Sequence, residues 1–144
     1  MLDSKKMMKI NSARDILILW LTGGILYFYM EILCRGYSHV SMLVCAGICF
    51  VLVGRIGAKW LSKRVTWNGL AKTFVLGAMI ISAMELATGI IVNVWLGLRV
   101  WDYSKLRYNF LGQICPTYTC LWGIVSIPAV YLYMLINVKI FQDD

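Results

Sequence analysis

The chain has 144 residues, of which 60% are apolar and 15% are charged, and its mean hydropathy is +0.74. A soluble domain of this length could not bury so much apolar surface, so the composition indicates a single membrane domain over residues 1–144. The net charge of +7 comes from basic residues that flank apolar runs, which favours membrane lipids as partners and argues against nucleic acid.

Residues 1–15 are polar and basic, and we interpret them as a cytoplasmic tail. Residues 16–33 form the first predicted span, with Glu31 as its one charged residue, near the far end. The aromatic run 27–29 lies at the same end, where membrane proteins carry an aromatic belt.

The first turn follows directly after this span. Arg35 comes four residues after Glu31, a helical spacing at which the two side chains can pair. Gly36 is predicted to end the helix and Ser38 to cap the next one. His39 is the one histidine of the chain. It is either a structural residue at the interface or, because of its neighbours Glu31 and Arg35, a functional one.

The second and third predicted spans cover about residues 40–60 and 73–98, with a basic loop over 61–72 between them. The second span carries Cys45 and Cys49 on one face, where cysteine behaves as a small apolar residue. The chain has five cysteines but no Cys-x-x-Cys pair. We therefore expect no metal site and no cofactor.

One polar stripe runs along the third span. Glu85 falls near mid-bilayer, and Gly89, Asn93 and Gly97 follow it at four-residue intervals. An acid in the hydrocarbon region costs about 2.5 to 3.5 kcal/mol on insertion scales, so we expect this stripe to face into the bundle.

Residues 99–113 are too polar to span the bilayer and too apolar for a free loop. They are expected to form an outer interfacial or re-entrant segment, with a turn capped by Asp102 or Ser104. The fourth predicted span covers about residues 116–140, and Pro128 would kink it unless a neighbouring helix compensates. The expected fold is an all-α integral membrane protein, a four-transmembrane-helix bundle with this segment between its third and fourth helices.

The distribution of basic residues predicts the orientation, because ten of them flank one side and four the other. We expect a multi-pass protein of the cell membrane with both termini cytoplasmic. Polar residues from separate stretches then gather at the outer end, with Glu85 below them. The candidates for a ligand or proton pathway are Glu85, Asn93, Glu31, Arg35, His39, Asp102, Asn109 and Gln113.

This cluster has two interpretations. Its members either form hydrogen bonds that hold two connections in place, or they line a polar pocket that opens outward and ends at Glu85. Such a pocket would admit a small ligand, a lipid headgroup or a proton.

Two motifs carry a resemblance to a known family. They are Glu31-x-x-x-Arg35-Gly36-Tyr37-Ser38-His39 and Trp101-Asp102-Tyr103-Ser104 followed by Asn109-x-x-Gly112-Gln113. With them, residues from about 16 to 140 resemble the bacterial family named putative ABC-transporter type IV, or putative ABC transporter permease. The resemblance implies a multi-span membrane protein with a role in transport, and it assigns no catalytic residues. The chain contains no Walker A loop, G-x-x-x-x-G-K-[ST].

Three functions are compatible with the sequence. The first is a permease-like transport component, acting with a second copy or a partner transporter subunit, in which the Glu85 stripe is part of the path. The second, less favoured, is an enzyme acting on a lipid or lipid-linked substrate at the outer surface. In it His39 or Glu31 would be the base, Arg35 would hold a phosphate and Asp102 would orient the histidine. The third is a non-catalytic membrane partner subunit.

Overall fold

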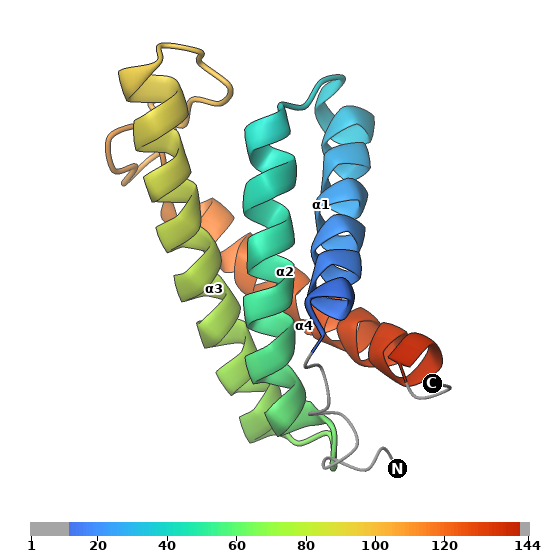
Figure 1. Cartoon of the computed structure of the whole chain (residues 1–144). Coiled ribbons are helices and arrows are strands. Elements are labelled where there is room, and N and C mark those ends of the chain that lie inside the picture. The colour runs from blue at the N-terminus through green and yellow to red at the C-terminus, as the bar shows by residue number, and fades with distance from the viewer. Residues whose placement is uncertain (1–11, 142–144) are drawn as a thin grey trace.

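The computed structural model describes residues 12–141, and their side chains as far as residue 138. These residues form helices and no strand, with two short connections and one long segment, 96–115, before the last helix (Figure 1). The helices in chain order are α1 (Ala13–Arg35), α2 (Val40–Leu61), α3 (Trp67–Gly89), the π-helical turn η1 (Ile90–Trp95) and α4 (Pro116–Phe141).

Four of these helices, with η1 counted as the end of α3, are long and apolar enough to cross a membrane. The predicted all-α fold with four potential spans is thus confirmed. Two connections, 36–39 and 96–115, lie at one end of the bundle, which we call the polar end (Figure 1). The α2–α3 loop lies at the opposite end, which we call the basic end. Residues 1–11 of the expected tail lie outside the described residues.

The turn between α1 and α2 differs in one detail from the prediction. Gly36 does end α1, with a φ of +82°, and its N–H donates to Ile32. The N-cap of α2, however, is His39 and not Ser38, because the Ser38 hydroxyl donates instead to Glu31. The Nδ1 of His39 accepts from the Ser41 N–H at 3.2 Å.

The third helix begins earlier and ends earlier than the predicted span. Thr66 caps it by accepting from the Gly69 N–H at 3.0 Å, so residues 67–72, expected as loop, form its first turns. At the other end the helix widens into η1 and stops at Trp95. Gly97 lies beyond it with a φ of +64°, so it does not belong to the helical stripe.

The apolar core lies toward the basic end. It contains Leu19 of α1, Phe50 and Val53 of α2, and Val130 and Tyr133 of α4, all at most 9% exposed. The rings of Phe50 and Tyr133 meet edge to face with 5.9 Å between their centroids. These contacts hold α4 against α2.

Small residues allow the helices to approach closely. A Cβ built on Gly77 of α3 would overlap the hydroxyl of Ser126 on α4, and one on Gly24 of α1 would lie 2.5 Å from the Leu43 carbonyl oxygen of α2. The chain continues as one helix through Pro128 in α4. In Figure 1, α4 crosses behind α3 and α2 at a steep angle. Its contact with α1 is slight.

Candidate functional site: a buried acid and the cavity beside it

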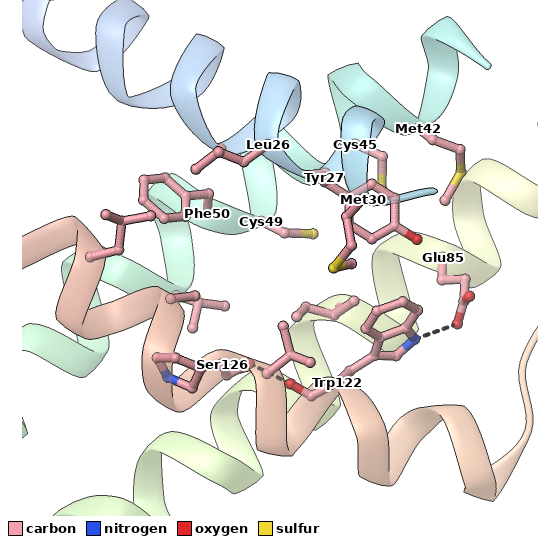
Figure 2. A pocket seen from close by; sticks show the side chains of 18 residues that line it. Leu26, Tyr27, Met30, Met42, Cys45, Cys49, Phe50, Glu85, Trp122 and Ser126 are labelled. Carbon is pink, nitrogen blue, oxygen red and sulfur yellow. Dashed lines mark hydrogen bonds between the residues drawn. The ribbon is translucent and has the colours of Figure 1, made fainter. Parts of the chain in front are cut away.

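Glu85 lies inside the bundle and is 2% exposed. Its Oε1 accepts a hydrogen bond from the Tyr103 hydroxyl at 2.7 Å. Its Oε2 accepts one from the indole N–H of Trp122 at 3.0 Å (Figure 2). The acid on α3 is therefore held by the 96–115 segment and by α4, two parts of the chain that are remote from it in sequence.

Glu85 has no positively charged partner among the residues that the structure describes. The ion pairs there join Arg14 to Asp15 and Arg35 to Glu31. Both donors to Glu85 are neutral side chains. They stabilise the carboxyl group by hydrogen bonding but give an ionised one no ion-pair partner.

The Tyr103 hydroxyl keeps the proton that it donates to the Glu85 carboxyl group. Burial, and next the nearby Glu85 carboxyl, raise the pKa of the Tyr103 hydroxyl well above its ordinary value. Its ring also stacks on Tyr118 of α4, with centroids 4.5 Å apart and planes 13° from parallel. Tyr103 thus stays protonated at neutral pH and is fixed between α3 and α4.

A second buried acid, Glu31, lies at the end of α1 and is 4% exposed. The predicted pair forms, with 2.7 Å between Arg35 Nη1 and Glu31 Oε1. The hydroxyls of Ser38 and Tyr27 also donate to Glu31, at 2.6 and 3.4 Å. The other arm of Arg35 donates to the Val100 carbonyl oxygen at 2.6 Å. This network joins α1 to the 96–115 segment.

A third group of contacts fastens the 96–115 segment onto η1. The Asn93 side-chain amide donates to Gln113 Oε1 at 2.8 Å, and its Oδ1 accepts from the Val100 N–H at 2.7 Å. The Trp101 indole N–H donates to the Gln113 carbonyl oxygen at 3.0 Å. Gly89 lies directly beneath, where a Cβ would overlap the Gln113 amide oxygen. Asn93 and Gln113 together therefore connect η1 to the 96–115 segment.

Within the part of the chain that the structure describes, three of the predicted candidates form hydrogen bonds only with residues close to them in sequence. His39 bonds to Ser41, as described above. Asp102 is exposed, and its carboxylate accepts from the Ser104 N–H at 2.8 Å, a bond that lowers the pKa of Asp102. Asn109 donates to Leu106 and Ser104 carbonyls within its own loop. Among the described residues, no hydrogen bond joins Asp102 to His39.

A cavity of about 280 Å³ lies beside Glu85, between α1, α2 and α4 (Figure 2). It differs from the expected polar pocket, because Glu85 is the one charged residue among the described residues that line it and nearly all the others are apolar. Leu26 and Met30 of α1 line it and are also 51% and 40% exposed, and Pro128 of α4 lines it and is exposed as well. The cavity therefore opens on the side of the bundle, at mid-helix.

Sequence reasoning missed the partners that matter most for this arrangement. Tyr103 belongs to one of the two motifs, but nothing in the spacing of Tyr103 or Trp122 predicts that both reach Glu85. Tyr27 lines the cavity as well, with its ring 5.9 Å from that of Trp122. The sequence shows an acid on one membrane helix and aromatic donors on other segments. It does not show which donor pairs with the acid.

The motifs that gave the resemblance are thus the ones that tie the polar end together. The model of the family described as Putative ABC-transporter type IV matches residues 16–143. The chain belongs to this family. Comparison of this ABC-transporter-related membrane protein with curated proteins and with solved structures finds no match. For this member of the type IV family, Arg35 and Tyr37 from the first motif donate to the carbonyl oxygen of Val100, next to the second.

Proposed function

We propose that this protein is a permease-like transport component whose substrate enters from the bilayer through the gap between α1 and α4. The substrate would occupy the apolar cavity and reach Glu85 at its end. The observation that supports this proposal most strongly is the position of Glu85, an acid that forms no ion pair with any described residue, in the lining of a cavity that opens at mid-helix. At that depth the opening faces acyl chains if the helices span the membrane.

Entry from the side is better supported than entry from the polar end. Above Glu85, the side chains of Glu31, Arg35, Asn93 and Gln113 bond to one another or to backbone. A polar route through them would require breaking several charge-assisted or buried hydrogen bonds. Entry between Leu26 and Pro128 requires breaking none of the hydrogen bonds that the structure describes.

The alternative of an enzyme at the outer surface has weaker support. It needs Asp102 beside His39, whereas Asp102 caps a turn and His39 caps α2. Its phosphate-binding residue, Arg35, already bridges Glu31 and Val100. The chain has no ATPase loop of its own, so ATP-driven transport would require a partner subunit. Both termini remain predicted to be cytoplasmic.

The proposal is tested with a photoreactive hydrocarbon, such as an alkyl diazirine, in lipid nanodiscs. Alkyl diazirines react with carboxyl groups, so a probe that enters the cavity should label Glu85 although that residue is 2% exposed. The variant Ala129→Trp fills the cavity that Ala129 lines and should abolish this labelling. Ala83→Trp, at an exposed position of α3, is the matched control and should leave it unchanged. Absence of Glu85 labelling in the wild type would refute lateral entry.

A further inference from the structure

The cavity and its surroundings also indicate which class of molecule would bind. This inference rests on the proposed function. We propose that the substrate is an amphipathic cation, with its charged head beside Glu85 and its apolar body along the cavity between α1 and α4.

The first argument concerns where the affinity comes from. An apolar tail that moves from acyl chains into an apolar cavity gains little, because both surroundings are hydrocarbon. The lining is apolar over most of its surface and polar at Glu85 and its neighbours. Selectivity for a bound molecule over bulk lipid must therefore come from the Glu85 end.

The second argument concerns the charge at that end. Each carboxylate oxygen has about two acceptor positions, and each Glu85 oxygen has one bond that the structure describes, from Tyr103 or from Trp122. Acceptor capacity therefore remains for a ligand. A cation placed there would form a direct ion pair with Glu85, which no described residue does, in a low-dielectric setting where opposite charges attract strongly. An anionic head would be repelled by the same carboxylate.

The third argument is the aromatic environment. Tyr27 of α1 and Trp122 of α4 both line the cavity next to Glu85, with their ring centroids 5.9 Å apart. Aromatic faces attract ammonium groups, including quaternary ones that carry no hydrogen-bond donor. Two rings beside one carboxylate form a suitable site for such a head group.

The fourth argument is size. A volume of about 280 Å³ is at the lower end of the range of small-molecule sites, which runs from about 300 to 1,000 Å³. This space suits a single alkyl chain or a compact apolar body. A phospholipid with two acyl chains would not fit without separation of α1 from α4.

Three probes with the same twelve-carbon tail separate charge from hydrophobicity: dodecyltrimethylammonium, dodecanol and dodecanoate. Binding to the protein in nanodiscs is measured by native mass spectrometry. We expect the cation to bind the wild type at least about tenfold more tightly than the alcohol, as an added charge pair predicts. Dodecanoate should bind most weakly.

Two variants test the assigned residues. Glu85→Gln should remove the preference for the cation and leave alcohol binding nearly unchanged. Tyr27→Leu keeps the carboxylate and should weaken cation binding by about two- to fivefold through loss of one aromatic face. Because Glu85→Gln loses one hydrogen bond, its thermal unfolding is measured alongside. If it fails to fold, Tyr27→Leu and the three-probe comparison decide the question.

The outcomes distinguish this inference from the proposed function. Equal binding of cation and alcohol to the wild type, or unchanged cation preference in Tyr27→Leu and Glu85→Gln, would overturn the cationic class. Diazirine labelling of Glu85 would then still support lateral entry. Loss of labelling together with loss of all probe binding would overturn both.

Discussion

Tyr103 and Glu85 are eighteen residues apart in the chain and are joined by a hydrogen bond of 2.7 Å inside the helical bundle. The bond fixes a non-helical segment to the last turns of α3. Because Tyr103 also stacks on Tyr118, the same side chain positions the acid and holds the segment over it.

Replacement of Tyr103 by Phe should therefore destabilise the protein while preserving the ring stack. We expect a loss of about 1.5 to 3 kcal/mol, the usual contribution of a hydrogen bond to a charged group. Thermal unfolding of the wild type and the variant in nanodiscs measures this loss of stability. Tyr108→Phe is the matched control, because Tyr108 is 86% exposed and should tolerate the change. Equal effects of the two substitutions would contradict the assigned role.

The same pair predicts a pH dependence. The pKa of Tyr103 is raised in the folded state, so its contribution to stability is complete below pH 10, the ordinary pKa of an unfolded tyrosine. Above pH 10 the unfolded chain loses this proton first, and stability should fall. The stability difference between wild type and Tyr103→Phe should narrow as pH rises beyond 10. A difference that stays constant from pH 8 to pH 11 would argue against the tyrosine proton.

Arg35 connects α1 to the 96–115 segment, so its removal should be costly. Arg35→Ala leaves Glu31 buried without its cation, and we expect a loss of about 2 to 4 kcal/mol, less than for a fully buried pair since Arg35 is partly exposed. Adding Glu31→Gln should restore part of that loss, because the unpaired charge is then gone. A double-mutant cycle on unfolding midpoints gives the coupling. Strict additivity would indicate that the pair contributes nothing.

The contact between α3 and α4 should tolerate no added atom at Gly77. Gly77→Ala brings a methyl group onto the Ser126 hydroxyl, and overpacking of this kind costs about 1 to 3 kcal/mol. The double variant Gly77→Ala with Ser126→Gly should regain most of the stability, because the new methyl group on α3 then occupies the space that the Ser126 side chain of α4 has left. Failure of this rescue would show that the two residues do not limit helix approach.

Asp102 should matter little beyond its own turn. Asp102→Asn keeps an oxygen that accepts from the Ser104 N–H, and both residues cap turns well. We expect a stability change within about 0.5 kcal/mol, as for other exposed positions. A large loss of function with normal folding would revive the alternative in which Asp102 serves an outer-surface reaction.

Several features of the fold could be read from local sequence. Long apolar runs define the four helices, and the i,i+4 spacing of Glu31 and Arg35 predicts their pair. Gly36 at the end of α1 follows from the same local logic. These features depend on neighbours within a few residues, which is why sequence patterns suffice for them.

Other features depend on how remote segments meet. Ser38 and His39 are both plausible caps, and the choice between them is made by Glu31, which takes the Ser38 hydroxyl. The basic residues near Lys72 suggested a loop, although charged side chains are tolerated in the first turns of a membrane helix near an interface. The cavity follows from the steep crossing of α4, and no periodicity in the sequence encodes that angle.

The six residues of η1 carry one further consequence. A π-helical turn holds a residue more than the α-helix around it, so the side chains beyond are offset by about 100° from an unbroken helix. Asn93 lies within this turn, where it meets Gln113 and Val100. If residues 90–95 relaxed to regular α-helical winding without losing a residue, Asn93 would turn away from Gln113 and Val100. The 96–115 segment would then lose its bonds to Asn93, although none of its own residues had been changed.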